Sequence, residues 1–215
     1  MKPLLSRGTN GKTGYTPLGG WTQARRAALS QELLTPIGAW TASLTISAAF
    51  MAVSLSLAGW SLPSPLVIAG LGVVAAIAEH GRVRINPYLE ESISLLPTLF
   101  AAVVFGPLAA MVVAAASMLG AFGSPYMKWA TYTSARSITG GFTGLAAVAA
   151  AGISDTHIAS VFLATTAGAI VSQLSDAAFA ALTLRVRNTG RPSEFLKTLG
   201  PLVFLAVPFL SLIHI

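Results

Sequence analysis

The chain of 215 residues contains no cysteine, which excludes disulfide bonds, thiolate metal sites and cysteine nucleophiles. Charge is almost as scarce, because 9% of the residues are charged, against about 25% in an ordinary soluble domain. Acidic residues are the rarer kind, with 7 Asp and Glu against 13 Lys and Arg, while hydrophobic residues make up 54% of the chain. This composition excludes a disordered chain and predicts an all-α, polytopic membrane bundle.

Two long runs, residues 33–78 and 92–127, carry no charge at all. The first is long enough for two spans of about 20 residues. It is interrupted at residues 59–65, where two prolines and Trp60 are typical of a turn at the membrane interface. The second run contains Phe105-Gly106-Pro107 near its middle, so it predicts either one long helix or two helices joined at Gly106.

The distribution of basic residues separates these alternatives. With one helix in 92–127, the Lys and Arg residues divide almost evenly between the two sides of the membrane. With a break at Gly106, all of them fall on the side of the N-terminal tail. Positive loops stay in the cytoplasm, so we expect six spans, a cytoplasmic N-terminus and a multi-pass location in the inner membrane. The basic excess therefore indicates topology and predicts no nucleic-acid partner.

The six predicted spans are Pro36–Leu57, Pro65–Ala78, Ser92–Phe105, Pro107–Phe122, Ser137–Ile153 and Ile158–Leu184. The third rises only ~21 Å as a helix, which is less than the ~30 Å of a hydrocarbon core. It must therefore begin before Ser92, thin the bilayer, or enter without crossing fully.

Three regions follow from this pattern. Residues 1–35 form a basic cytoplasmic tail, and residues 36–209 form the membrane domain, with a truncated seventh span that begins at Leu199. Residues 210–215 read LSLIHI, which resembles the translation of a transposon end used to fragment DNA for sequencing. We therefore expect the natural gene to continue beyond Phe209.

Catalytic chemistry finds little support in the sequence. The three histidines are scattered, and no HExxH, Walker A or GxSxG motif occurs. Glu79 and His80 are adjacent, so on a helix they point about 100° apart and do not form a metal-binding pair. We expect no enzyme activity, metal or cofactor in the region present.

Asp176 is the main candidate site residue, because it lies inside the sixth predicted span, close to Gln173. An ionisable group within a span is costly and usually faces the bundle interior or a water-filled cavity. Gln173 and Asp176 are three residues apart and share a helix face. Two interpretations stay open: a contact to a small ligand or ion, or a carboxylate paired with Arg136 or Arg185.

Other patterns carry weaker predictions. Glu90 and Glu91 have two interpretations. They either begin the third helix, where the helix dipole stabilises acidic side chains, or bind a cation or a basic partner. Arg82 and Arg84 alternate with apolar residues, which predicts a short extended segment at the headgroup surface. Small residues recur at a spacing of four and predict close helix packing within the chain or a docking surface, including one for a homodimer; these pairs are Gly140 and Gly144, Ala110 and Ala114, and Ala164 and Gly168.

Three segments together carry a family resemblance: residues 79–85 (EHGRVRI), 92–97 (SISLLP) and 100–110 (FAAVVFGPLAA). They resemble the multi-span N-terminal sensor regions of bacterial signalling proteins, which precede output domains such as HD-type phosphohydrolases, diguanylate cyclases or histidine kinases. The resemblance covers residues 36–209 and implies an input module whose output domain is missing. It departs from the family in that no output domain is present.

The Phe-Gly-Pro-Leu turn at 105–108 also resembles the substrate-binding subunits of energy-coupling-factor vitamin transporters, which are six-helix proteins of about this length. Those subunits bind their vitamin with aromatic, polar extracellular loops, whereas residues 59–64 offer only Trp60 and residues 154–157 are very short. The sequence therefore favours a membrane sensor with an unknown small ligand, and a transport subunit is the alternative.

Overall fold

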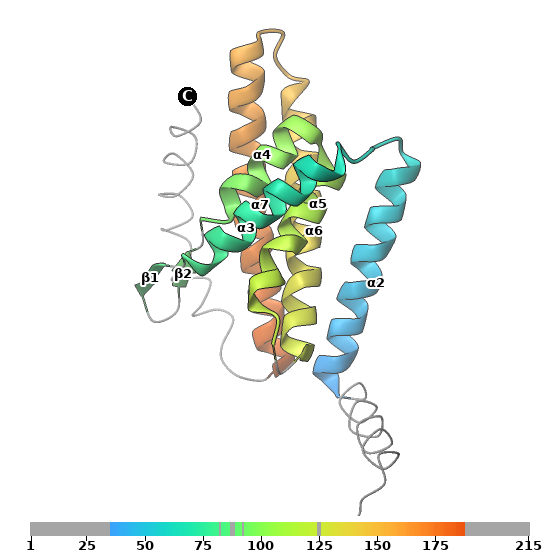
Figure 1. Cartoon of the computed structure of the whole chain (residues 1–215), viewed down its shortest axis with the longest axis vertical. Helices are drawn as coiled ribbons and strands as arrows, with labels where there is room; N and C mark the ends of the chain where they lie inside the picture. Colours follow the sequence, from blue (N-terminus) through green and yellow to red (C-terminus); the bar gives the residue numbers. More distant parts are fainter. Residues whose placement is uncertain (1–34, 82, 87–88, 92, 124–125, 188–215) are drawn as a thin grey trace, which may run out of the picture.

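The computed structural model describes residues 35–81, 83–86, 89–91, 93–123 and 126–187, and these form a helical bundle (Figure 1). The elements, in chain order, are helices α2 (Pro36–Leu57) and α3 (Pro65–His80), strands β1 (Val83–Asn86) and β2 (Leu89–Glu91), helices α4 (Leu95–Phe105) and α5 (Pro107–Ala116), the 3-10 helix η1 (Ser117–Ala121), and helices α6 (Tyr126–Ala151) and α7 (His157–Arg187).

Prolines set the beginning of three helices. Pro36, Pro65 and Pro107 each occupy the first turn, where the missing N–H is not needed and the fixed φ favours the helix. The hydroxyl of Thr35 caps α2 by accepting a hydrogen bond from the Gly38 amide at 3.2 Å. The predicted starts of these helices are therefore confirmed, and the predicted end of α2 is confirmed as well.

Helices α2, α6 and α7 run along the long axis of the molecule, whereas α3 and α4 lie oblique to it (Figure 1). Helix α6 is central, because it packs against α2, α4, α5 and α7. The connections α2–α3, α4–α5 and α6–α7 lie toward one end of the bundle, and the η1–α6 connection lies at the other. The β1–β2 hairpin lies between the two ends.

The predicted break at Gly106 is confirmed. Gly106 has φ +86°, a left-handed conformation that side chains rarely adopt, and it separates α4 from α5. A Cβ atom at this position would also meet the ring of Trp60 at 2.5 Å. The turn therefore needs glycine twice, for its backbone angle and for the close approach of the indole.

The small-residue pairs pack within the chain, as one of the two alternatives predicted. A Cβ atom on Gly140 would meet the Ala110 carbonyl oxygen at 2.5 Å and the Ala114 Cβ at 2.8 Å. One turn further on, a Cβ on Gly144 would collide with the backbone of Pro107. These glycines let α5 approach α6 closely, and Ala164 of α7 joins Ala102, Ala110 and Ala147 in the same buried cluster.

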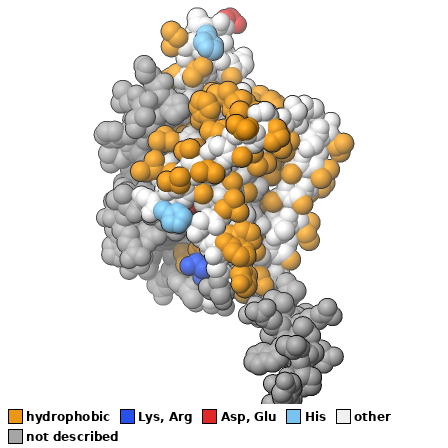
Figure 2. All heavy atoms as spheres, in the orientation of Figure 1, with side chains coloured by type: hydrophobic (Ala, Val, Ile, Leu, Met, Phe, Trp, Pro, Cys, Tyr) orange, Lys and Arg blue, Asp and Glu red, His pale blue; other side chains and the backbone are white. Residues whose placement is uncertain are grey.

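Hydrophobic side chains cover much of the face shown in Figure 2. On α2, the side chains of Ile46, Phe50 and Leu57 are 69%, 73% and 84% exposed. Within the described residues, α2 and α7 are long and apolar enough to cross a membrane. Only 17% and 28% of their most apolar windows are buried, so neither is the core helix of a soluble domain. An exposed apolar surface of this extent is that of a membrane-associated protein.

Several predicted boundaries need correction. Helix α4 begins at Leu95 instead of Ser92. Before it, strands β1 and β2 are antiparallel, with Arg84 opposite Glu90 in the register. Glu90 and Glu91 therefore lie on a strand, and the prediction that they begin a helix is wrong. The predicted extended segment around Arg84 is confirmed as β1. Helix α6 begins at Tyr126 instead of Ser137, and α7 extends to Arg187.

Some predictions concern residues outside the described part of the chain. These are the basic tail up to residue 34, the truncated span from Leu199, and the final segment 210–215.

Candidate functional site between helices α6 and α7

An ion pair joins α6 to α7. The guanidinium Nη1 of Arg136 donates to Oδ2 of Asp176 at 2.8 Å. The two side chains are 26% and 32% exposed, so the pair lies at the margin of the helix contact and not on an open surface. A charge-assisted hydrogen bond of this length is among the stronger single contacts available to two helices.

A hydroxyl completes the carboxylate's surroundings. Thr139 lies three residues after Arg136, on the same face of α6, and its Oγ1 donates to Oδ1 of Asp176 at 3.0 Å. Both oxygens of Asp176 are therefore engaged by α6, which explains how a carboxylate is accommodated within an apolar helix.

Two further polar side chains lie close to the pair in sequence and are unsatisfied. The hydroxyl of Thr133, one turn before Arg136, is buried without a hydrogen-bond partner among the described residues. Gln173 is half-buried one turn before Asp176, and its amide forms no hydrogen bond within the described part of the chain. Buried polar groups normally have partners, so the Thr133 hydroxyl has unused hydrogen-bonding capacity one turn from Arg136.

Polar contacts also join α2 to its neighbours. The hydroxyls of Thr41 and Thr131 lie 2.6 Å apart, and those of Thr45 and Ser134 lie 3.0 Å apart, which links α2 to α6. On α7, Thr183 accepts a hydrogen bond from the indole Nε1 of Trp40 at 3.2 Å. The three long helices are thus held together by polar bonds over the half of α6 that lies near its N-terminus.

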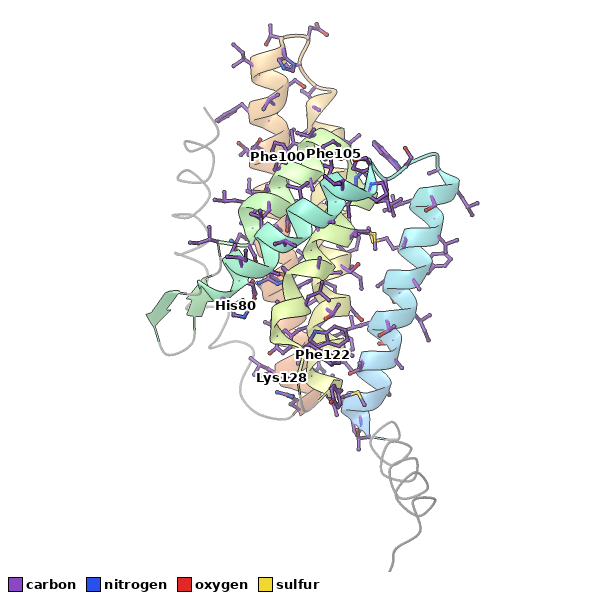
Figure 3. The ribbon with its side chains drawn as sticks, in the orientation of Figure 1. His80, Phe100, Phe105, Phe122 and Lys128 are labelled. Carbon is purple, nitrogen blue, oxygen red and sulfur yellow. The ribbon has the colours of Figure 1, made fainter. Side chains whose placement is uncertain are left out.

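Aromatic side chains close the end of the bundle where α6 begins (Figure 3). The ring of Phe122 packs edge-on against Trp129, with centroids 5.0 Å apart, and the Trp129 indole donates to the Met118 carbonyl at 2.8 Å. The Lys128 ammonium lies 6.0 Å from the centre of the Tyr132 ring. Trp, Tyr and Lys side chains at one end of a bundle are typical of a membrane–water interface.

A second acidic residue is buried away from this site. Glu79 is 4% exposed near the end of α3, and its Oε2 accepts a hydrogen bond from the Ser94 hydroxyl at 2.6 Å. The contact ties α3 to the residue that precedes α4. Gly72, Ala75 and Glu79 follow helical spacing and share the buried face of α3, so this spacing is the signal that sequence reasoning missed.

The structure brings together some of the predicted residues. Asp176 pairs with Arg136, which is one of its two predicted partners, and Arg185 is not the partner seen here. Gln173 lies on the same helix as Asp176, but no hydrogen bond joins the two side chains in the described part of the chain. Sequence reasoning missed Thr139, although its spacing from Arg136 places it on the same face.

This arrangement is a polar contact between two helices. Arg136 and Asp176 hold each other's charge, and among the described residues no group of three His, Asp or Glu side chains is assembled that could hold a metal ion. The fold and the site together define a helical, membrane-associated protein with a polar contact between two long helices. Comparison with protein-family models, curated proteins and solved structures finds no match.

Proposed function

We propose that the chain crosses the cytoplasmic membrane of a bacterial cell six times, with its N-terminus in the cytoplasm. The connections α2–α3, α4–α5 and α6–α7 then lie outside, and the first turn of α6, with Lys128, lies inside. Arg185 and Arg187 end α7 on the same inner side, which agrees with the preference of positive residues for the cytoplasm. Helices α3 and α4 are short and oblique, and the hairpin between them lies short of the inner end of the bundle, so six crossings require a thinned bilayer at this point.

Within this topology, the chain acts as the membrane input module of a signal-transduction protein. The observation that carries the proposal is the ion pair of Arg136 with Asp176, supported by Thr139, because it links the central helix α6 to the last described helix, α7. Helix α7 has 31 residues, or about 46 Å at 1.5 Å per residue. It therefore extends past a ~30 Å hydrocarbon core and can carry a shift toward the cytoplasm.

The mechanism rests on two packings of α6 against α7. One has the ion pair formed, and the other has it opened or shifted. A small ligand favours one packing only if it binds the two packings with different affinity. A change in the bilayer must likewise stabilise one packing more than the other. The hydrogen-bonding groups of Thr133 and Gln173, close to the pair in sequence, are where such a difference would arise.

The natural gene provides the first test. Amplified and sequenced from its genome across codon 209, it should encode one more span followed by a soluble domain with enzymatic motifs of its own. In that complete protein, Asp176→Asn should change the output activity in the absence of a stimulus, whereas Asp155→Asn, in the exposed α6–α7 turn, should not. A gene that stops after one further span, beside genes for transporter ATPases, would contradict the proposal and favour the transport subunit.

A further inference from the structure

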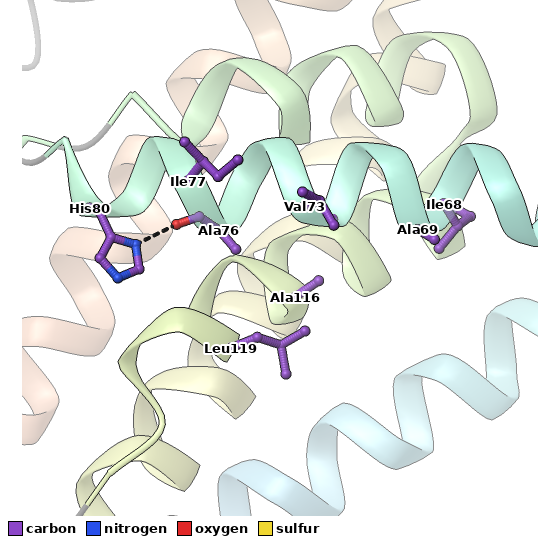
Figure 4. Close-up of a pocket in the computed structure, with 9 residues that line it drawn as sticks. Ile68, Ala69, Val73, Ala76, Ile77, His80, Ala116 and Leu119 are labelled. Atoms are coloured by element: carbon purple, nitrogen blue, oxygen red, sulfur yellow. Dashed lines mark hydrogen bonds between the residues drawn. The ribbon is translucent and has the colours of Figure 1, made fainter.

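A groove of about 430 Å³ lies between α3 and the η1 end of α5, away from the ion pair (Figure 4). Its volume is within the roughly 300–1,000 Å³ typical of small-molecule sites. Nine residues line it, and eight of these have no polar side-chain atom. The lining residues are Ile68, Ala69, Gly72, Val73, Ala76, Ile77, His80, Ala116 and Leu119.

The groove is open on its outer side, where Val73, Ile77 and Leu119 are exposed. Its α3 wall extends from Ile68 to His80, which is about 18 Å of helix at 1.5 Å per residue. At Gly72 the helix lies close to Ala116, because a Cβ atom there would meet the Cβ of Ala116 at 3.0 Å. An extended acyl chain can therefore lie along the apolar wall of α3.

His80 supplies the one polar group, at one end of the groove (Figure 4). Its Nδ1 lies 2.8 Å from the carbonyl oxygen of Ala76. A carbonyl only accepts, so Nδ1 carries a proton and donates. Nε2 has no hydrogen bond within the described part of the chain. The ring rests on Gly120, where a Cβ atom would collide with it.

The chemistry of Nε2 selects the head group of an occupant. In the neutral ring Nε2 accepts a hydrogen bond, and in the charged ring it donates one. A carboxyl group pairs with both forms, as a protonated acid with the neutral ring and as a carboxylate with the charged ring. A phosphodiester and an alkyl ester have no proton to donate, so each can pair only with the charged ring.

We propose that this groove binds a long-chain fatty acid, with the acyl chain along α3 and the carboxyl group on His80. The inference names a ligand class for the proposed input module and rests on its membrane placement. It does not depend on the output domain, so a failed gene test leaves the binding test valid.

The test uses the full chain in phosphatidylcholine vesicles with a diazirine-bearing palmitic acid as the probe. Light-induced labelling should saturate, map to peptides from residues 68–80 and 116–121, and be competed by palmitic acid. Methyl palmitate has the same chain without the acid and should compete at least about tenfold less well, because a charge-assisted hydrogen bond is lost. Equal competition by the ester would overturn the assignment of the carboxyl group.

Three variants sharpen the test. Ala69→Leu fills the groove and should abolish saturable labelling, whereas the matched control Ala49→Leu, on the exposed surface of α2, should leave it unchanged. His80→Ala removes the polar partner, and Gly120→Ala displaces the ring while keeping it, so both should weaken acid binding about tenfold. Labelling that rises linearly with the probe and ignores Ala69→Leu would mean that bulk phospholipid fills the groove, and the proposal would fail.

Discussion

At the scale of single residues, the stability of the bundle depends on a few charges with specific partners. The carboxylate of Asp176 is accommodated within an apolar helix because Arg136 and Thr139 each donate a hydrogen bond to one of its oxygens. Removing the charge of Asp176 weakens its hydrogen bond with the Arg136 guanidinium, which then lacks a counter-charge from this residue. An exposed ion pair is worth about 0–1 kcal/mol, and breaking a buried one costs about 3–5 kcal/mol, so this half-buried pair lies between these limits.

Asp176→Asn should therefore lower the free energy of unfolding by about 1–3 kcal/mol, measured by equilibrium denaturation in detergent micelles. Asp155→Asn, on an exposed turn, is the matched control and should change it by less than about 0.5 kcal/mol. The variant that combines Asp176→Asn with Arg136→Gln should lose less stability than the sum of the two single changes. Strictly additive losses would show that the two side chains do not interact.

Sequence reasoning at this scale finds the important acid but not its full environment. Asp176 is conspicuous because it interrupts an apolar run, and Arg136 is one of two possible partners. Which arginine pairs depends on how far α7 slides along α6, and no local pattern encodes that distance. Glu79 is harder to identify as a buried residue, since its position beside His80 directs attention to metal binding instead.

At the scale of helices, close approach between α5 and α6 positions the polar contacts. Gly140 and Gly144 leave no room for a side chain against Ala110 and Pro107. In a bilayer, helices associate through such van der Waals contacts and polar bonds, because lipid removes the hydrophobic driving force between them. The α5–α6 contact thus holds the central helix in place.

A pair of glycine substitutions tests this contact. Gly144→Ala should lower the free energy of unfolding by about 1–3 kcal/mol, because overpacking costs that much, even though alanine favours a helix by ~1 kcal/mol. Gly70→Ala is the matched control, also within a helix but with open space around the added methyl group, and should be neutral or stabilising. The two melting temperatures in the same detergent provide the comparison. A similar effect of both changes would rule out tight packing at Gly144.

Most helix boundaries can be predicted because local residues determine them. Prolines in the first turn begin α2, α3 and α5, and Gly106 ends α4. Helix α6 begins earlier than predicted, because the charges of Lys128 and Arg136 are more typical of a loop than of a span. In the structure Lys128 reaches a tyrosine ring and Arg136 pairs with Asp176, so neither charge interrupts the helix. The hairpin depends on pairing between β1 and β2, which the charge pattern does not indicate.

At the scale of the whole molecule, the exposed apolar surface is that of a membrane-associated protein. Composition alone predicts this class, since scarce charge combined with long apolar runs is typical of helical membrane proteins. The number of crossings is harder to predict, because α3, α4 and α5 are each short and only their order and turns suggest how the chain passes. The proposed signalling function depends on the proposed switching of α6 against α7.

The sidedness of two connections tests the central claim most directly. The chain has no cysteine, so the variants Thr156→Cys and Lys128→Cys each present a single thiol to a membrane-impermeant maleimide applied to intact cells. The six-crossing account predicts that position 156, between α6 and α7, reacts from outside, and that position 128 reacts only after the cells are permeabilised. The reverse pattern would mean that α6 crosses the membrane in the opposite direction, and it would contradict the account.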